Sequence, residues 1–596
     1  MGHAPYIAIV DFGSQYTHLI ARNFRELGVE TRIVRPRVAT KNVRGVGGII
    51  LSGGPKSVLK NPIRYNPQLL TLPVPTLGLC YGHQLLAHAL GGMVTPSTIR
   101  EYGRARLRLT RPHPLLNGLP NLSTVWMSHG DSVTKLPAKF VTLASTATLR
   151  QAAVAHVSKP IFGLQFHPEV HHTQFGRTIL QNFAFTICGL KPTTRRGLLQ
   201  KITAEVRIQV GKKKVFLLVS GGVDSTVAFA LLNRILGPSH VYGLHVDTGL
   251  MRLGESKQVQ QALARAGFKN LRLVKAGTTF FKRLKRLTEP EAKRNMIGQT
   301  FLDVKAQLEK RLKLNARHWL LGQGTIYPDT IESGGTAHAD KIKTHHNRIG
   351  ILAHLAKQNL LVEPLKELYK DEVRQLGAEL ELPQELLWAH PFPGPGLGVR
   401  VLCLSAPEAK RLNSTEPPTI KVSGYPTRVL PLRSVGVQGD ERSYRNPVAI
   451  DTPYATAAKL HRLATGLTNQ HHSINRVLLK LVGPNLNDGT AHTAFLTPPR
   501  VKLLQQADAV VTQEIKRAKL YYKLWQCPVV LAPFGVRYGE SLILRPFASR
   551  EAMTGQAYLL PRSVIQRIIK RLERLKHFDF IFYDLTDKPP GTVEWE

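Results

Sequence analysis

The sequence predicts an α/β protein over roughly its first two thirds, followed by an α+β region. With 596 residues, the chain is too long for one hydrophobic core, so we expect about three to five domains. Short apolar runs alternate with helical patterns, and a glycine or a polar loop follows each run closely. In α/β proteins the active residues lie at the carboxyl ends of such strands. The loops after the apolar runs are therefore the places where chemistry is expected.

The first region contains four predicted buried strands. They are Tyr6–Val10, Gly48–Leu51, Thr76–Leu79 and Ile161–Phe166. The segment Gly189–Gly197 contains glycine, proline and basic residues and is typical of a linker. We therefore predict a first domain over residues 1–192.

A second α/β unit follows the linker. Its predicted elements are the strand Val215–Val219, the helix Asp224–Leu236, and the strands Val241–Val246 and Trp319–Leu321. The segment His390–Leu397 is rich in proline and glycine, which interrupt regular structure, and we expect it to close the unit. This predicts a second domain over residues 198–398 and a third over 399–596.

The third region contains a faint internal repeat. Val429–Val437 resembles Val529–Arg537, and Ile474–Leu481 resembles Phe578–Leu585. Two copies at a similar offset predict a duplicated α+β subdomain. In the second copy the segment Val564–Leu575 predicts a helix with one apolar face and one basic face. The basic face consists of Arg567, Lys570, Arg571 and Arg574.

Composition and charge narrow the class of protein. A hydrophobic content of 43% is typical of a globular chain. No apolar run approaches the ~20 residues that span a bilayer. We also expect no signal peptide, because the first predicted strand leaves no room for one. The four cysteines are scattered without a CxxC pair, which favours a reducing compartment. We therefore expect a cytoplasmic protein. The net charge of +41 indicates either a polyanion partner or only a basic, solvated surface.

A cysteine lies between a predicted strand and a predicted helix. Cys80 is flanked by Gly78 and Gly82, which permit the tight turn that lifts a nucleophile out of a sheet. A lone cysteine is more often a small buried hydrophobic residue. However, His167 and Glu169 follow another predicted strand and offer a base with an orienting carboxylate. Cys80 is therefore a candidate nucleophile.

Two further segments supply polar groups for the same chemistry. Ser52–Pro55 places backbone amides at a strand end, as an oxyanion hole requires, and Ser128–Asp131 offers polar groups for a small polar substrate. With the cysteine and histidine segments, they resemble the class I glutamine amidotransferase family in all parts of its motif set. The resemblance implies that Cys80 attacks the glutamine side-chain amide, that His167 transfers protons and that Glu169 orients His167. It also implies oxyanion and glutamine-binding residues: Gly53, Gly54, Tyr81, Gln84, Ser128, His129, Gly130 and Asp131.

A glycine-rich loop follows the first strand of the second region. In Ser220–Ser225 the glycines let backbone amides approach phosphate oxygens, and hydroxyls and a helix N-terminus add donors. The loop is not a Walker A loop, because the Gly-Lys-Ser/Thr ending is missing; an ordinary glycine-rich turn is the alternative. The loop resembles the signature of ATP pyrophosphatases, which cleave ATP between the α- and β-phosphates. This leaves the synthesis of NAD, asparagine, argininosuccinate or GMP open.

Downstream segments favour one of these products. The segments that resemble the GMP synthase family are Val246–Glu255, Leu321–Ser333, Ile342–Asn347, Glu363–Arg374, His390–Leu397 and the tail Tyr583–Glu596. The resemblance spans essentially the whole chain and implies amination of XMP with ATP, a Mg²⁺ ion bound largely through the ATP phosphates, and a homodimer formed by the C-terminal region. It implies ATP-binding residues Ser220, Gly221, Gly222, Val223, Asp224, Ser225, Thr226, Gln323, Gly324 and Thr325. It implies XMP-binding residues Arg294, Lys343, Asp440, Gln526, Lys588 and Glu594.

Some features depart from this interpretation. Asp587 stands where the family has a serine, and we expect its charge beside Lys588 to weaken XMP binding. The pair His345-His346 has no carboxylate or cysteine at ligand spacing, so it is a weak zinc motif. The charge favours a different class of function, a nucleic-acid-binding protein on the same scaffold. An amidotransferase with another acceptor is a third alternative, which the motifs from Leu321 to Glu596 oppose.

Overall fold

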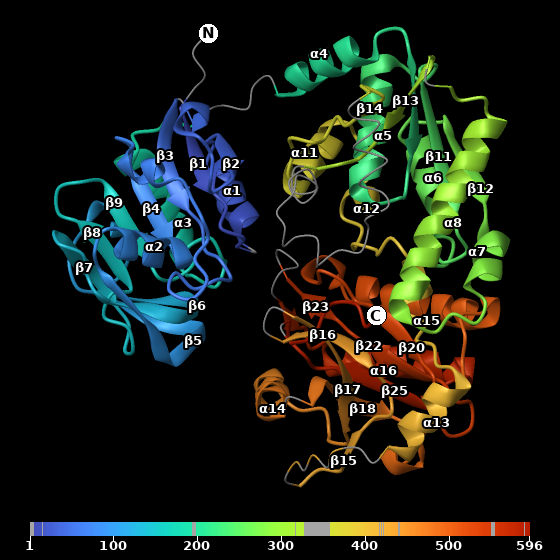
Figure 1. Ribbon diagram of the computed structural model, residues 1–596. Helices are drawn as coiled ribbons and strands as arrows, with labels where there is room; N and C mark the ends of the chain where they lie inside the picture. Colours follow the sequence, from blue (N-terminus) through green and yellow to red (C-terminus); the bar gives the residue numbers. More distant parts are fainter. Residues whose placement is uncertain are drawn as a thin grey trace. The chain divides into compact units, whose positions relative to one another are not determined.

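The computed structural model describes most of residues 5–596. The residues left out within this range are 15, 44, 193–197, 316, 327–357, 416–417, 419, 421, 423, 439–440, 472, 550–554 and 589. The chain divides into two compact units, Met1–Leu199 and Gln200–Glu596. Figure 1 colours the first unit from blue to cyan and the second from green to red. Each unit is described by itself.

The first unit is built on a nine-stranded mixed sheet with the order β2-β1-β3-β4-β9-β8-β7-β5-β6. In this order, β2, β1, β3, β4 and β9 pair in parallel with their neighbours. The strands β8, β7, β5 and β6 continue the sheet beyond β9 by antiparallel pairing. Their bounds are β1 Tyr6–Val10, β2 Thr31–Val34, β3 Val46–Leu51, β4 Thr76–Leu79, β5 Met93–Leu109, β6 Leu122–Lys135, β7 Phe140–Ser145, β8 Ala153–His156 and β9 Ile161–Leu164. This confirms the α/β class predicted for this part of the chain.

The helices of the first unit pack on the parallel strands. Helix α2 (Tyr81–Ala89) contacts β4 and β9, whereas α1 (Thr17–Glu26) and α3 (Gly176–Gln181) contact each other. Helix α1 buries Ile20 and Phe24, which lie four residues apart and therefore on one face. The apolar face of α1 is therefore buried inside the first unit.

The second unit begins with a parallel sheet in the order β12-β11-β10-β13-β14. Its strands are β10 Lys214–Leu218, β11 Val241–Asp247, β12 Leu271–Lys275, β13 Trp319–Gly322 and β14 Leu361–Val362. The chain runs outward from β10 to β12 and then returns to β13 on the other side of β10. Ligands of open α/β sheets bind at such a switch point, outside the carboxyl ends of the strands.

Helices surround this parallel sheet (Figure 1). They are α4 Leu198–Val210, α5 Val223–Leu236, α6 Glu255–Arg265, α7 Gly277–Leu284, α8 Pro290–Arg311, α11 Lys370–Glu379 and α12 Gln384–Leu387. Helix α8 begins at Pro290, and the Glu289 side chain accepts a hydrogen bond from the Ala292 amide, an arrangement that satisfies a free amide at a helix start. Within the part of the chain that is described, no helix combines the length and the apolar character needed to cross a bilayer.

A seven-stranded sheet follows, in the order β15-β17-β18-β25-β22-β20, with β16 paired to β17. Its strands are β15 Thr427–Val429, β16 Ser434–Gln438, β17 Glu441–Ile450, β18 Ile474–Val482, β20 Val529–Ala532, β22 Ser541–Leu544 and β25 Phe580–Asp584. Short strands β19 (Thr490–Ala491) with β21 (Phe534–Gly535), and β23 (Phe547–Ala548) with β24 (Gln556–Ala557), form two separate pairs.

The seven-stranded sheet has the same order of pairing from either edge. Each edge strand pairs antiparallel with its neighbour, the next pair is parallel, and β18 and β25 meet antiparallel at the centre. Helix α14 (Ala457–Gln470) lies between β17 and β18 in the chain, and α16 (Arg562–Leu572) lies between β22 and β25. This is the order that a duplicated subdomain would produce. The duplication itself stays a prediction.

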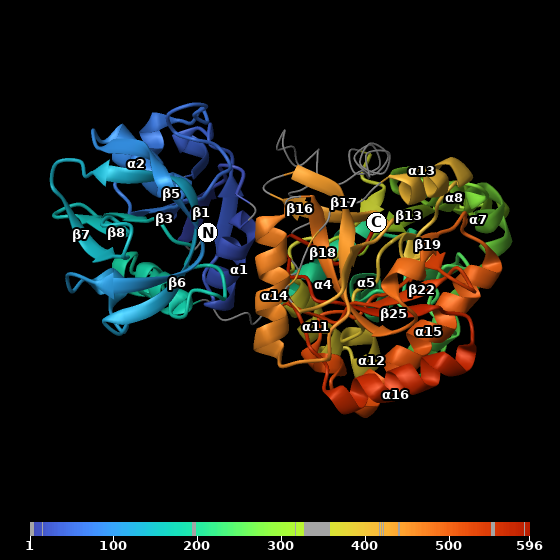
Figure 2. The ribbon, with the colours of Figure 1, turned by 90° about the horizontal axis from the view of Figure 1, so that it is seen from below.

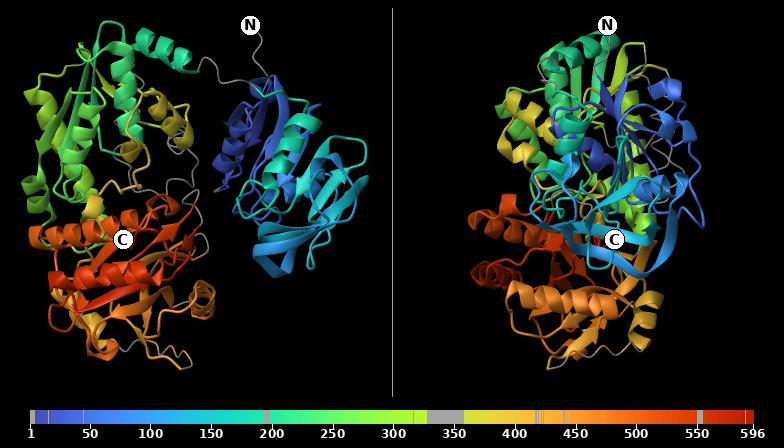
Figure 3. Two further views of the ribbon diagram at one scale, coloured as in Figure 1. Left: turned by 180° about the vertical axis from the view of Figure 1, so that it is seen from behind. Right: turned by 90° about the vertical axis from the view of Figure 1, so that its left-hand side faces the viewer.

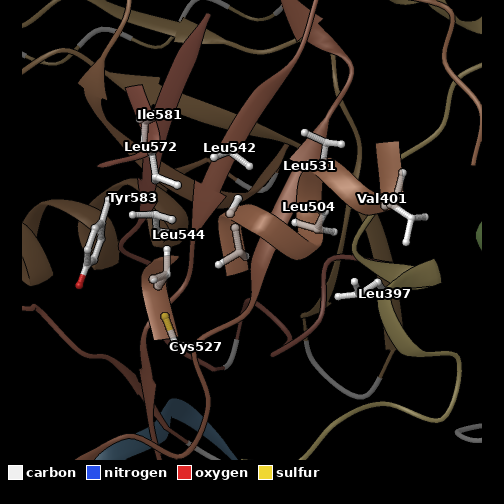
Figure 4. Close-up of a cluster of buried hydrophobic side chains, with 14 of the residues drawn as sticks. Leu397, Val401, Leu504, Cys527, Leu531, Leu542, Leu544, Leu572, Ile581 and Tyr583 are labelled. Carbon is white, nitrogen blue, oxygen red and sulfur yellow. The ribbon is translucent and has the colours of Figure 1, made fainter. Parts of the chain in front are cut away.

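Helices α15 (Pro498–Arg517) and α16 contact each other, as the views from below and from behind also show (Figures 2 and 3). Under them lies a buried cluster to which Leu504, Leu544 and Tyr583 contribute (Figure 4). The same cluster continues through Leu397 to Phe216 of the parallel sheet. The two sheets of the second unit therefore share one core, and the domain boundary between 398 and 399 stays a prediction. Helix α13 (Ala406–Ser414) completes the described helices of this region.

Candidate active sites

Cys80 lies at a sharp turn between β4 and α2. Its φ is +50°, in the left-handed region that is strained for a residue with a Cβ. The turn requires glycine on both sides: a Cβ on Gly78 would lie 2.5 Å from the Gly82 carbonyl oxygen, and a Cβ on Gly82 would lie 2.2 Å from that of Leu51. The fold therefore holds Cys80 at the carboxyl end of its strand in the conformation of a nucleophile elbow.

The loops after β3, β4 and β9 bring the predicted catalytic residues together, because these strands are neighbours in the sheet. His167 and Glu169 are both buried, and His167 Nδ1 lies 2.8 Å from Glu169 Oε1. The His167 side chain also forms a hydrogen bond with Cys80. Thr173 donates a hydrogen bond of 2.6 Å to the backbone carbonyl of His167. The imidazole is thus fixed between a thiol and a carboxylate.

The charge of His167 depends on these two neighbours. Burial alone would lower the pKa of His167, but the charges and hydrogen bonds of Glu169 and Cys80 outweigh burial and raise this pKa to about 10 from an ordinary 6.5. The imidazole is therefore cationic at neutral pH. A cationic imidazole beside the sulfur can donate a proton to the group that leaves when the sulfur attacks a substrate.

Backbone groups close to Cys80 are suited to bind an oxyanion. A Cβ on Gly53 would lie 3.2 Å from His167 Cε1, and a Cβ on Gly54 would lie 2.8 Å from the Phe12 carbonyl oxygen. The loop after β3 therefore approaches the site with its backbone rather than with side chains. Tyr81 is the first residue of α2, where an amide has no carbonyl partner within its own helix. Amides in this setting stabilise negative charge.

The predicted glutamine-binding residues lie on α2 and on β6. Gln84 Nε2 donates a hydrogen bond of 2.7 Å to the backbone carbonyl of Asp131. The Cys80 sulfur lies 3.5 Å from the carbonyl oxygen of Ser128. Strand β6 therefore runs past the sulfur with the whole predicted stretch Ser128–Asp131.

The loop after β10 is held by its own hydroxyl groups. Ser225 Oγ accepts a hydrogen bond of 3.1 Å from the Ser220 amide and lies 3.0 Å from Ser220 Oγ. It also donates one of 3.1 Å to the Gly222 carbonyl. Gly221 has a φ of +88°, which glycine adopts without strain. The amides that start α5 follow directly, so the loop has the donors that a phosphate group needs.

Asp224 has one carboxylate oxygen with no hydrogen-bond partner among the described residues. This atom, Oδ1, is buried, whereas Oδ2 lies 3.6 Å from Lys370 Nζ. Burial raises the pKa of the Asp224 carboxyl, and Lys370 partly opposes the shift. A carboxylate oxygen beside a phosphate loop fits a hard divalent cation. A group of three or more His, Cys, Asp or Glu ligands is not found in the described part of the chain.

The loop after β13 packs on the phosphate loop. A Cβ on Gly324 would lie 2.8 Å from the Ser225 amide nitrogen. Thr325 donates a hydrogen bond of 2.5 Å to Glu363 Oε1, and the Gln323 amide donates one of 2.9 Å to a carbonyl of β14. The predicted ATP-binding residues of both loops therefore meet at the switch point between β10 and β13.

The C-terminal tail brings together several predicted XMP-binding residues. Glu594 accepts hydrogen bonds of 2.9 and 2.8 Å from Arg400 and one of 3.4 Å from Gln526. Arg294, on α8, donates to the backbone carbonyl of Glu596. The predicted residues Gln526 and Glu594 are thus in direct contact, and Arg294 touches the same tail.

Lys588 lies in the same tail, but it contacts other residues than Glu594 and Glu596 do. Its backbone pairs with Gly555, and burial, with the charge of Arg545, lowers the pKa of Lys588 to about 8. Lys343 and Asp440, the remaining predicted XMP-binding residues, lie outside the described residues, as does the His345-His346 pair.

Sequence reasoning missed the buried ions beneath the tail. Arg476 and Arg545 share the Asp584 carboxylate at 2.8 and 2.9 Å, and Trp595 Nε1 donates to the same carboxylate at 3.1 Å. All are buried. Burial and the nearby Arg545 together lower the pKa of Arg476 to about 9, although Asp584 opposes both. The available signal was a charged residue inside an apolar run, such as Arg476 beside Val477.

The predicted basic face of α16 is partly neutralised. Arg567 and Arg571 both bind Glu514 on α15, each at 2.9 Å. This corrects the expectation of a wholly basic surface, because two of its cations are engaged inside the unit. The ion pairs explain why a helix with so many cations can lie beside another helix.

The nucleophile elbow on a parallel sheet, with its histidine and glutamate, indicates an enzyme that attacks an amide carbonyl through cysteine. A family model described as "Glutamine amidotransferase class-I" matches residues 8–187. A second family model, "GMP synthase C terminal domain", matches residues 513–595. These two matches cover both ends of the chain.

Full-length relatives define the family. A protein of Leptospira interrogans named "Probable GMP synthase", glutamine-hydrolysing, is 42% identical over 99% of this chain and 99% of its own length. The glutamine-hydrolysing GMP synthase of Thermobifida fusca is 36% identical over 99% of this chain and 98% of its own length. The chain belongs to the family of glutamine-hydrolysing GMP synthases. A solved glutamine amidotransferase of Thermotoga maritima is 20% identical, covers 31% of this chain and 84% of its own, and has a TM-score of 0.26.

Proposed function

We propose that this chain synthesises GMP from XMP, with glutamine as the nitrogen donor and ATP as the energy source. The products are GMP, AMP, pyrophosphate and glutamate. The arrangement of Cys80, His167 and Glu169 carries the proposal, in a chain that is similar over 99% of its length to glutamine-hydrolysing GMP synthases.

The first reaction releases ammonia at Cys80. The Cys80 sulfur attacks the side-chain carbonyl carbon of glutamine, while the amides of Gly54 and Tyr81 stabilise the oxyanion. His167 gives its proton to the departing ammonia, which leaves a thioester, and then takes a proton from the water that releases glutamate. Glu169 keeps the imidazole oriented. Glutamine itself is held by Gly53, Gln84, Ser128, His129, Gly130 and Asp131.

The second reaction takes place at the loop Ser220–Thr226. Its amides and hydroxyls hold the ATP phosphates, and Gln323–Thr325 lie beside the nucleotide. The oxygen on C2 of XMP attacks the α-phosphorus of ATP and releases pyrophosphate. Ammonia then attacks C2 and displaces AMP. Mg²⁺, which enters with ATP, neutralises phosphate charge when bound, and the unpaired oxygen of Asp224 is suited to contact it.

XMP binds at the C-terminal tail and α8. Arg294 and Lys588 are the cations for its phosphate, whereas Gln526 and Glu594 provide hydrogen bonds to its polar groups. Lys343 and Asp440 complete the proposed set. This assignment is supported by the contacts among Gln526, Glu594 and the tail.

A product assay tests the proposal. The purified chain is incubated with XMP, Mg²⁺-ATP and either glutamine or an ammonium salt, and the nucleotides are separated by chromatography. We expect GMP from both nitrogen sources, with one AMP and one pyrophosphate for each GMP, and glutamate only from glutamine. Failure to form GMP from either source would contradict the proposed function, as would amination of a different acceptor.

We also propose that the protein is a cytoplasmic homodimer. The dimer is what the resemblance of the C-terminal region to the GMP synthase family implies, and the scattered cysteines support a reducing compartment. Light scattering at assay concentration is expected to give twice the mass of the chain, and a mass of one chain would contradict the dimer.

The net charge of +41 supports one further property. Two phosphorylated substrates need only a few cations, so most of the excess is left over. We propose that the protein also binds polyanions such as RNA or DNA without sequence preference, as a property added to its enzymatic activity.

A further inference from the structure

Three hydrogen bonds fix the backbone around Lys588. The Lys588 amide donates to the Gly555 carbonyl at 2.9 Å, and the Gly555 amide donates to the Lys588 carbonyl at 3.1 Å. The Ala557 amide donates to Asp587 Oδ1 at 2.9 Å. Asp587 is therefore the side chain that ties the tail to β24 immediately before Lys588. A shift of Asp587 would move the base of the Lys588 side chain.

A histidine from another element contacts this junction. His461, on α14, has its Nδ1 atom 3.6 Å from Asp587 Oδ1 and also forms a hydrogen bond with the backbone of Ala557. His461 thus touches both partners of the bond between the tail and β24. The neighbouring Asp587 raises the pKa of His461, although burial opposes the shift, so the contact favours the cation.

The position of Asp587 gives the protonated form of His461 a role in the binding of a phosphate. An unneutralised carboxylate on the residue before Lys588 would repel a phosphate that approaches Lys588. Both side chains of the pair are only partly exposed, 28% for His461 and 29% for Asp587, so water screens the carboxylate incompletely. A protonated His461 cancels this charge at short range.

We propose that His461 is a positioning residue for XMP binding, which holds Asp587 against β24 and neutralises it so that Lys588 is available to the XMP phosphate. The inference rests on the proposed role of Lys588. It also revises the expectation that Asp587 simply weakens XMP binding, because the structure supplies Asp587 with a partner.

The test measures synthesis from ammonia, so that the glutaminase does not contribute. His461→Ala is expected to raise the KM for XMP about threefold to tenfold, within the range for coupled neighbouring residues. The KM for ATP and kcat are expected to stay within about twofold. The matched control is Arg462→Ala, which removes an exposed cation from the same helix and is expected to leave the KM for XMP unchanged.

A second substitution separates positioning from simple loss of structure. In His461→Ala/Asp587→Asn the unpaired carboxylate is gone while an oxygen remains for the Ala557 amide, so the KM for XMP is expected to return toward the wild-type value. His461→Gln, which retains a donor, is expected to have a smaller effect than His461→Ala and serves if the alanine variant does not fold. An unchanged KM in both single His461 variants, or no recovery in the double variant, would overturn the inference.

Lys588→Ala in the same assay distinguishes this inference from the proposed function. If Lys588→Ala raises the KM for XMP and the His461 variants do not, only the inference fails. If Lys588→Ala leaves the KM for XMP unchanged, the proposed phosphate contact is wrong, and the inference fails with it.

Discussion

Cys80 is the residue whose loss separates the two chemistries. Cys80→Ala is expected to abolish GMP synthesis from glutamine, because the proposed thioester forms on the Cys80 sulfur. Synthesis from ammonia is expected to stay within about twofold of wild type, because the synthetase site belongs to the other unit. Cys188→Ala is the matched control, since Cys188 is a free cysteine of the same unit outside the site. Normal glutamine-dependent synthesis by Cys80→Ala would show that another residue is the nucleophile.

Glu169 controls the pH range of the first reaction. Glu169 and Cys80 raise the pKa of His167 to about 10, so the wild-type imidazole stays protonated well above neutral pH. The stabilisation from this pairing is complete below pH 6.5 and is lost as the pH rises through about 10. In Glu169→Gln only Cys80 remains to oppose the effect of burial on the His167 pKa. The basic limb of the pH profile of glutaminase kcat/KM is therefore expected to move down by about 1–3 pH units. An unmoved basic limb would mean that Glu169 does not set the His167 charge.

The candidate residues of the first site could be predicted because each lies in a compact local motif. Cys80 has its glycines beside it, and His167 and Glu169 are two residues apart. Arg400 and Asp584 could not be predicted in the same way, because their partners lie far along the chain. A lone charged residue in an apolar run indicates a buried ion but does not identify its partner.

The loop Ser220–Thr226, proposed to bind ATP, is expected to be the element on which synthesis from both nitrogen sources depends. Ser225→Ala removes the hydroxyl that binds Ser220 and Gly222, so the loop loses its internal hydrogen bonds and its grip on ATP. Synthesis is expected to fall about tenfold or more with glutamine and equally with ammonia. Ser239→Ala, at an exposed turn of the same unit, is the control. A variant rate near wild type in both assays would remove this loop from the ATP site.

Most strands of the parallel sheets were predicted, although β2, β12 and β14 were not, and none of the antiparallel strands of the first unit was predicted. Strands β1 and β4 have the predicted bounds, and β9 ends at Leu164 rather than at Phe166. A strand buried on both faces is a continuous apolar run that stands out in a sequence. In β5, by contrast, Arg104, Arg106 and Arg108 alternate with smaller or apolar residues. This two-residue alternation is the signal that would have predicted a half-exposed strand.

For the whole molecule, the charge leads to a binding prediction. Labelled duplex DNA and single-stranded RNA are expected to bind at low salt, with an affinity that falls steeply as salt rises, because each neutralised phosphate releases counterions. Lys570→Glu/Arg574→Glu reverses the two cations of the basic face other than Arg567 and Arg571, which bind Glu514. It is expected to weaken binding and to reduce the salt slope. Cys80→Ala is expected to bind as wild type. A lack of binding at low ionic strength, where screening is least, would leave the charge without this role.

The sequence alone identified the family of the whole chain but not how its core is divided. The long-range motifs indicated GMP synthase from end to end, and the relatives confirm this. The hydrophobic cluster that joins Phe216 and Leu397 to the seven-stranded sheet was not expected. Local patterns predict which residues are buried, but they do not say which sheets share a core.

The position of β25 affects how the protein is made. This strand comes last in the sequence, yet it lies between β18 and β22 at the centre of its sheet. Until the ribosome has added β25, the two halves of the sheet have no strand to join them, and each presents an open edge that can pair with another chain. A premature stop that removes only the segment after α16 would therefore take away the middle of the sheet rather than its margin. Nascent and shortened chains of this protein should be those most prone to aggregate.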